Sequence, residues 1–148
     1  MCQSYHRPCA CGSRESEIFF GGNVFGPSVV QQVYCPSCAG KVTLDPASTV
    51  QDNGWVLVFD PEVVSSHAQQ LDARDETITA DEVFDRNFVT WVGFTPEDNH
   101  VRNREREELA VQHAEDKRAH FMALKQWAVE REKRLAAEGW RKALRSGR

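Results

Sequence analysis

The stretches CAC at residues 9–11 and CPSC at residues 35–38 each place two cysteines within one short turn. Zinc prefers four soft ligands in a tetrahedron, and cysteines two or three positions apart can aim both sulfurs at one point. Gly12 and Gly40 follow the two pairs closely and permit the sharp backbone turns that such loops need. The sequence therefore predicts one metal site with four thiolate ligands, which are Cys9, Cys11, Cys35 and Cys38.

This predicted site is expected to hold zinc, with iron as the less favoured ion. When four cysteine sulfurs fill a tetrahedron, no position remains for water or substrate, so we predict a structural site and assign no catalytic residue. Two alternatives stay open for neighbouring residues. His6 could replace one cysteine as a ligand, and Cys2, the fifth cysteine, could act as an amino-terminal nucleophile.

The length and composition limit the protein to one ordinary domain, or to a small domain with an appendage. The chain has 148 residues, and its 18 basic and 22 acidic side chains give a net charge of -4. No apolar run reaches the length of a signal peptide or of a membrane span, so we expect a soluble cytoplasmic protein. In that reducing compartment, paired cysteines are typically metal ligands rather than disulfides.

The charge is unevenly distributed along the chain. Residues 1–60 carry a net charge of -2, residues 61–100 carry -7, and residues 101–148 carry +5. An acidic middle and a basic tail could attract each other within one molecule or across a dimer, or they could bind another partner. The sequence does not choose among these arrangements.

Three short strands are predicted around the cysteine pairs. Residues 18–20 and 29–34 are rich in β-branched and aromatic side chains and flank two glycines at 21–22, a pattern typical of a β-hairpin. Residues 41–44 are a third candidate strand, and residues 55–59 form a further, buried one. We therefore expect the two cysteine pairs at the ends of a small antiparallel sheet.

Two short helices are predicted after this sheet. Asp60 stands before a proline, which predicts a helix start, and the helix should run to about residue 71. Thr79 and Glu82 form a capping-box pattern, and the apolar residues that follow keep helical spacing as far as Trp91.

A long helix is predicted from residues 95–98 to about residue 144, a stretch that contains no proline after its start and only one glycine, Gly139. At about 1.5 Å per residue it would form a rod of roughly 65 to 70 Å if unbroken, too long to pack on a small module. Its heptad-like positions at 110–135 include two basic side chains, so they form a weak coiled-coil seam. We expect this helix to dock on a partner, or to fold back once near Gly139.

The predicted fold class is α+β, with a small antiparallel zinc-ribbon sheet, short helices and a long C-terminal helix. The predicted organisation is a zinc-ribbon-like β module at 1–60, a short helical segment at 61–95 and a long basic helical tail at 96–148.

Two further patterns have simpler interpretations. His113, Asp116 and His120 have the spacing of one helix face and could bind a metal, although with Lys117 and Arg118 beside them a solvated face is the favoured interpretation. The basic tail at 140–148, with its tryptophan, could grip a nucleic-acid backbone and stack a base. Cations at a helix end also complement the helix dipole, and a pI near 5.7 argues against a dedicated nucleic-acid-binding protein.

The cysteine pattern over about residues 5–45 resembles the zinc-ribbon and rubredoxin-like modules, in which two such turns clamp a three-stranded sheet. CPSC is similar to the second turn of that class, with Ala39 inserted before the usual glycine. The first pair has one residue between its cysteines instead of two, a departure that disfavours a redox-active iron centre. A weaker resemblance, to the small zinc-binding subunit of acetone carboxylase-type enzymes, covers both pairs and the stretch 55–62, and it implies a module that serves a larger enzyme.

These patterns together predict a non-catalytic accessory or scaffold subunit with a structural four-cysteine zinc site. It would dock through its C-terminal helix on a larger protein or enzyme complex, or form a homo-oligomer. The first alternative is a nucleic-acid-binding or transcription-associated zinc ribbon. The second is a rubredoxin-like iron redox carrier.

Overall fold

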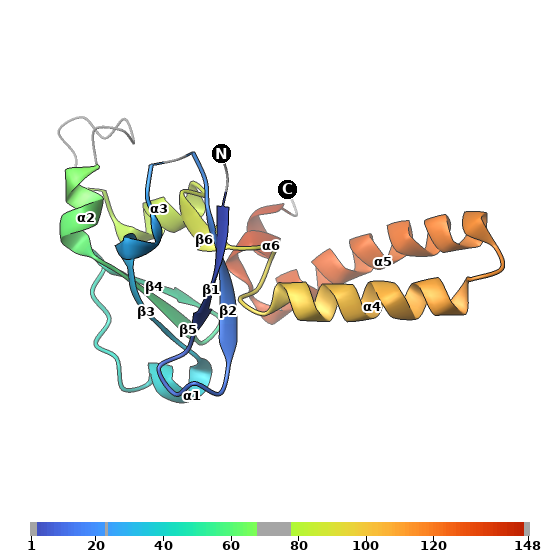
Figure 1. Cartoon of the computed structure of the whole chain (residues 1–148), viewed down its shortest axis with the longest axis horizontal. Helices are drawn as coiled ribbons and strands as arrows, with labels where there is room; N and C mark the ends of the chain where they lie inside the picture. The colour runs from blue at the N-terminus through green and yellow to red at the C-terminus, as the bar shows by residue number, and fades with distance from the viewer. Residues whose placement is uncertain (1–2, 23, 68–77, 147–148) are drawn as a thin grey trace. The chain divides into compact units, whose positions relative to one another are not determined.

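The computed structural model describes residues 3–22, 24–67 and 78–146, and its elements are labelled in Figure 1. The fold is mixed α+β, as predicted, and the chain divides into two compact units at residues 1–92 and 93–148. Among the described residues, no helix combines the length and the apolar character that crossing a membrane requires.

The first unit contains two antiparallel three-stranded sheets. The first sheet has the order β1-β2-β6, and the second has the order β3-β5-β4. The register of the first sheet places Ile18 opposite Trp91, and that of the second places Val33 opposite Leu57. The strands are β1 (Gln3–Pro8), β2 (Glu15–Phe20), β3 (Val30–Tyr34), β4 (Thr49–Asp52), β5 (Trp55–Phe59) and β6 (Val89–Trp91).

The predicted hairpin between residues 18–20 and 29–34 is wrong, because β2 pairs with β1 and β6 while β3 pairs with β5. Gly21 serves a close backbone approach instead of a hairpin turn. A Cβ atom at Gly21 would lie 2.5 Å from the carbonyl oxygen of Asn87. The N–H of Gly21 donates to the carbonyl of Phe88 at 3.0 Å. The predicted strand at 41–44 is also wrong, since this stretch lies in a turn and loop after α1.

Short helices connect the strands, and the local capping signals are confirmed. The Asp60 carboxylate accepts backbone N–H groups at the start of α2, and the Thr79 hydroxyl accepts the Glu82 N–H at the start of α3. Residues 68–71, the predicted end of α2, lie outside the described residues. These elements are a 3-10 turn η1 (Pro27–Val29), α1 (Pro36–Ala39), α2 (Pro61–Ser66) and α3 (Ala80–Asp85).

The predicted continuation of the second helix to Trp91 is wrong. Asn87 has a left-handed backbone (φ 65°), which ends the helical turn, and the β-branched residues Val89 and Thr90 then enter strand β6. Helical spacing alone did not distinguish these two outcomes, because Phe88 and Trp91 keep that spacing although they follow the end of α3.

An aromatic cluster forms the centre of the first unit. Trp91 meets Trp55 edge-on with a centroid distance of 6.2 Å and Phe84 with a distance of 5.8 Å. The indole N–H of Trp91 donates to the carboxylate of Asp52 at 2.8 Å, and both side chains are buried. Strands of both sheets and helix α3 therefore share one core.

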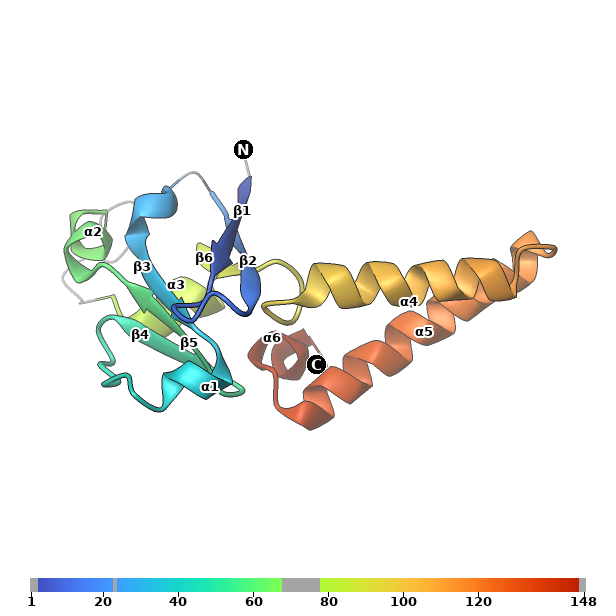
Figure 2. The same ribbon diagram turned by 60° about the horizontal axis from the view of Figure 1, so that its bottom comes forward.

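The second unit is a helical hairpin followed by a short helix (Figure 2). The predicted long helix is confirmed only in part, because the chain reverses between His113 and Asp116 instead of folding back near Gly139 alone. Asp116 caps the second helix by accepting two backbone N–H groups, and Gly139 (φ 100°) ends it. The heptad-like positions at 110–135 span this reversal and form no single seam. The helices are α4 (Asp98–Gln112), α5 (Lys117–Glu138) and α6 (Arg141–Ser146).

Candidate metal centre

Each cysteine pair lies in a closed turn directly after a strand. Cys9 follows β1, and its N–H donates to the Arg14 carbonyl at 2.8 Å, while Gly12 returns a hydrogen bond to Cys9 with a left-handed backbone (φ 73°). Cys35 follows β3 and begins α1, where the N–H groups of Cys38 and Ala39 both donate to its carbonyl at 2.9 Å. These local hydrogen bonds hold the two sulfurs of each pair on one side of their turn.

The two turns meet through backbone contacts between the sheets. Cys9 forms an isolated parallel bridge with Val33, and the Ala10 N–H donates to the Val33 carbonyl at 3.2 Å. The N–H of Cys35 donates to Cys9 Sγ at 3.0 Å. Because β1 belongs to one sheet and β3 to the other, the cysteines gather where the two sheets approach each other.

The four sulfur atoms have the spacing of a tetrahedral thiolate site. They lie within 4.8 Å of one another, and the measured Sγ–Sγ distances are 3.9 Å for Cys11 and Cys35 and 3.8 Å for Cys35 and Cys38. Metal–sulfur bonds of about 2.3 Å in a regular tetrahedron imply sulfur–sulfur edges of about 3.8 Å. A disulfide needs about 2.05 Å, and all four cysteines are free. The donor set therefore fits a thiophilic divalent metal.

The cluster has a buried side and an exposed side. Cys9 and Cys35 are buried, Cys11 is exposed and Cys38 is half-buried. A surface depression beside the exposed side is lined by Cys11, Cys38, Tyr34 and Lys41, among other residues. Within the described ranges, these cysteines are the only group of three or more Cys, His, Asp or Glu side chains whose ligand atoms lie close enough to hold a metal.

The local environment shifts the pKa values of Cys11, Cys35 and Cys38 in different directions. Hydrogen bonds with the Ser13 backbone and with Cys9 lower the pKa of Cys11 to about 6. Burial opposes ionisation of Cys35, but hydrogen bonds with Cys9 and with the backbone of the second turn lower its pKa overall. Hydrogen bonds with Cys9 and Cys11 raise the pKa of Cys38 to about 12. A bound cation would favour the deprotonated form of all four cysteines together, because a metal ion binds thiolates and releases their protons.

The other predicted candidates do not join the cluster. His6 is exposed on β1, opposite Glu17, and Cys2 lies outside the described residues. The shared helix face predicted for His113, Asp116 and His120 is wrong, because the chain reverses between them and the Asp116 carboxylate caps α5. In the basic tail, the indole N–H of Trp140 donates to Glu138 at 2.9 Å, so this side chain is engaged locally.

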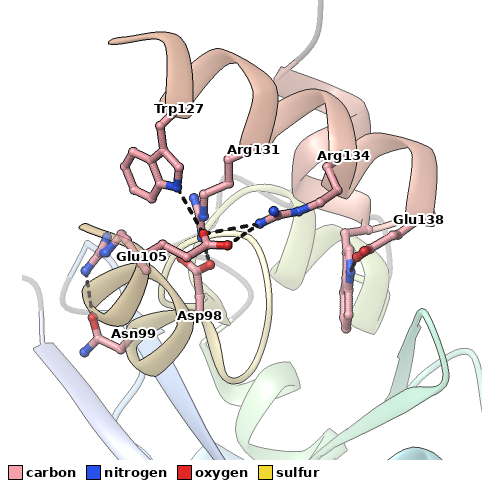
Figure 3. Close-up of polar contacts among 9 residues, drawn as sticks. Asp98, Asn99, Glu105, Trp127, Arg131, Arg134 and Glu138 are labelled. Atoms are coloured by element: carbon pink, nitrogen blue, oxygen red, sulfur yellow. Dashed lines mark hydrogen bonds and ion pairs between the residues drawn. The ribbon is translucent and has the colours of Figure 1, made fainter. Parts of the chain in front are cut away.

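Sequence reasoning missed a buried ion pair in the second unit (Figure 3). Asp98 at the start of α4 pairs with Arg131 of α5, and both side chains are buried. The Arg131 guanidinium also lies over the rings of Phe94 and Trp127, at 5.2 Å and 5.6 Å. A Cβ atom at Gly93 would collide with the Asp98 carboxylate, so this approach requires glycine.

A second carboxylate extends the same network. Glu105 accepts the indole N–H of Trp127 at 3.0 Å and the guanidinium of Arg134 at 3.0 Å and 3.3 Å. The network joins residues roughly twenty to thirty positions apart, and no short sequence motif marks such a pairing.

Comparisons with protein-family models, with curated proteins and with solved structures find no match to this chain. The four-cysteine cluster is consistent with a zinc-ribbon-like site through its geometry.

Proposed function

We propose that the protein is a non-catalytic accessory or scaffold subunit whose cysteines hold one structural zinc ion. The observation that carries this proposal is the position of the cluster, where the turn after β1 in one sheet meets the turn after β3 in the other. Zinc bound there would join the two sheets as a covalent crosslink would, without needing an oxidising compartment.

The donor set supports a structural role. Four cysteine sulfurs fill a tetrahedron and leave no place for water or substrate. The Cys35 N–H, which donates to Cys9 Sγ at 3.0 Å, would orient that thiolate and support its negative charge. The single residue between Cys9 and Cys11 favours zinc over iron, because single-iron centres usually have the longer spacing on both sides.

The second unit supports the docking part of the proposal. Its large apolar side chains at half exposure or more are Val111, Phe121, Met122, Val129 and Leu144. These exposed apolar groups are the feature that leads us to propose a partner for the second unit, since a contiguous apolar patch marks an interaction site. A larger protein or enzyme complex would bind this helical unit while the metal centre holds the first unit folded.

X-ray absorption at the zinc edge, on full-length protein purified without added metal, tests the metal part. The proposal predicts four sulfur neighbours at about 2.3 Å and no lighter atom in the first shell. An oxygen neighbour would indicate an open position and contradict a closed structural site, whereas a nitrogen neighbour would indicate a histidine in place of one cysteine. Iron in place of zinc would favour the redox-carrier alternative.

Native mass spectrometry of the tagged chain isolated from its own cell tests the docking part. We expect a complex of defined stoichiometry, heavier than the 16.8 kDa chain. Recovery of the single chain alone would contradict a scaffold role. Salt-dependent retention on mixed oligonucleotides would instead support the nucleic-acid-binding alternative.

A further inference from the structure

We propose that the exposed side of the cysteine cluster is a site of oxidation by peroxide, at which Cys11 and Cys35 form a disulfide and the metal is released. This inference rests on the proposed function, because it adds a redox response to the same structural site. The disulfide would join the turn after β1 to the turn after β3, so the two sheets would exchange a metal crosslink for a covalent one.

The four sulfurs differ in their access to solvent, and that of Cys11 is the most accessible. Cys11 is exposed and Cys38 is half-buried, whereas Cys9 and Cys35 are only 3% and 1% exposed. The surface depression beside the cluster is lined by Cys11 and Cys38 but by neither buried cysteine. A metal-bound cysteine is a thiolate, which is the form of sulfur that attacks peroxide. Hydrogen peroxide that enters the depression therefore reacts first with Cys11.

Cys35 is the cysteine best placed to complete the disulfide. Its Sγ lies 3.9 Å from Cys11 Sγ, and its side chain is buried. An oxygen atom added to Cys11 from the depression points toward solvent. A second thiolate displaces that oxygen most readily from the opposite side, in line with the sulfur–oxygen bond. The buried Cys35 provides a thiolate on that inner side.

The two other cysteines are less suited to this bond. A single residue separates Cys9 from Cys11, so a disulfide between them would close a very small ring with strained geometry. Cys9 Sγ also accepts the N–H of Cys35 at 3.0 Å, which stabilises it in its present position. Cys38 lines the same depression as Cys11 and would approach from the side of the leaving oxygen.

One molecule of peroxide balances the reaction. The Cys11 thiolate attacks one peroxide oxygen, the O–O bond breaks, and hydroxide leaves a sulfenic acid on Cys11. The Cys35 thiolate then attacks Cys11 Sγ, so that the S–S bond forms and the S–O bond breaks with loss of a second hydroxide. The two sulfurs give up two electrons, and two protons convert the hydroxides into water. The site has then lost two of its four ligands and releases the metal.

The position of the disulfide decides whether the first unit stays folded without the metal. A bond between Cys11 and Cys35 links turns that follow strands of different sheets, and it constrains the chain between them. A bond between Cys35 and Cys38, whose sulfurs are 3.8 Å apart, would lie within the turn that begins α1 and would link no other element. We therefore expect the oxidised protein to keep its fold after the metal has left.

The first test treats zinc-loaded full-length protein with one equivalent of hydrogen peroxide, in a Cys2→Ser background that removes the fifth thiol. A zinc-binding dye should report the release of one zinc per chain. Free thiols are then alkylated in the unfolded protein, and disulfide thiols are alkylated with a second reagent after reduction. Mass spectrometry should find the first label on Cys9 and Cys38 and the second label on Cys11 and Cys35.

Two histidine variants form a matched pair. Cys11→His and Cys38→His each keep four metal ligands, because a histidine nitrogen also binds zinc, and each replaces a cysteine that lines the depression. In zinc-loaded protein, Cys11→His should slow the peroxide-driven release at least tenfold, and Cys38→His should change it by no more than about threefold. Equal rates would contradict first attack at Cys11. If either variant fails to bind zinc, the label positions in the protein with all four cysteines still decide.

Amide exchange tests the structural consequence. In chelator, the oxidised protein should keep protection in β1 and β3, whereas the reduced protein should lose it. Loss of protection in both forms would contradict a crosslink between the two turns.

The results separate this inference from the proposed function. A disulfide between Cys35 and Cys38, a sulfinic acid on Cys11, or zinc retained after peroxide would overturn the oxidation site and leave the structural zinc standing. A purified protein that holds no zinc would overturn the proposed function. The label positions would still show whether peroxide joins Cys11 to Cys35.

Discussion

The two units of this protein are stabilised by opposite kinds of interaction. The first unit encloses an aromatic core between two sheets, with Trp55, Trp91 and Phe84 nearly inaccessible, and gathers four sulfurs where the sheets meet. The second unit joins two helices through a buried ion pair, Asp98 with Arg131, and exposes much of its apolar surface. The comparison shows that the first unit places its polar contacts and its cysteines around an apolar core, whereas the second unit depends on charge pairing between two helices, and we propose that a metal completes the first and a partner covers the second.

Removing two ligands should have the largest effect. Cys35→Ser with Cys38→Ser should unfold the first unit, because structural zinc contributes on the order of 10 kcal/mol, comparable with the whole stability of a small domain. The near-ultraviolet circular dichroism of the Trp55–Trp91 pair reports this loss, and amide exchange reports each unit separately. Cys2→Ser is the matched control, since the proposal gives Cys2 no ligand role.

The variant that lacks Cys35 and Cys38 also tests whether the second unit is stable independently of the first. The amides of α4 and α5 should keep their protection, because the ion-pair network there involves no cysteine. Equal loss of protection in both units would show that they do not stabilise themselves independently.

Breaking the buried ion pair should have the next largest effect, confined to the second unit. Arg131→Met would leave the buried Asp98 carboxylate without its cation, at a cost of about 3 to 5 kcal/mol. Replacing both partners, with Asp98→Leu added, should recover more than half of this loss because no isolated charge remains. Amide protection in α4 and α5 measures both. A double variant as unstable as the single one would argue against the ion-pair explanation.

Two matched tryptophan variants compare the polar anchors of the units. Trp91→Phe removes the indole donor to Asp52, which is 1% exposed, and should cost about 1 to 3 kcal/mol in urea unfolding of the first unit. Trp127→Phe removes the same kind of donor from Glu105, whose side chain is 20% exposed, and should cost less. The opposite order of effects would mean that burial does not determine how much each indole hydrogen bond contributes to the free energy of unfolding.

The smallest effect is expected at the surface of the network. Arg134, at 49% side-chain exposure, pairs with Glu105, so Arg134→Ala should cost less than about 1 kcal/mol, and added salt should reduce the difference. Denaturant unfolding at low and high salt measures this. A loss above 2 kcal/mol that salt does not change would place Arg134 among the essential contacts of the hairpin.

Local signals in the sequence predicted local structure well. The helix starts at Asp60 and Thr79, the strand at 55–59 and the closeness of the two cysteines within each pair all follow from residues within a few positions of one another, where spacing determines geometry. Each candidate ligand pair belongs to this class because it closes its own turn.

Long-range pairing was not predictable in the same way. The sequence of residues 18–20 suits half of a hairpin and the middle strand of a sheet equally well. Gly21 is required by the close approach of the Asn87 backbone, which lies far along the chain. The ion pair between Asp98 and Arg131 joins side chains that look like ordinary surface residues of helices. Their contact exists only because Asp116 caps a second helix and reverses the chain.

The most direct test of the account is the metal content of the full-length protein, determined by elemental analysis of freshly purified material together with amide exchange. We predict one zinc per chain, and a chelator that removes it should abolish protection in the strands of the first unit. A protein that contains no stoichiometric transition metal, and whose amides in β1, β3 and β5 are still protected from exchange, would contradict the proposed structural metal site.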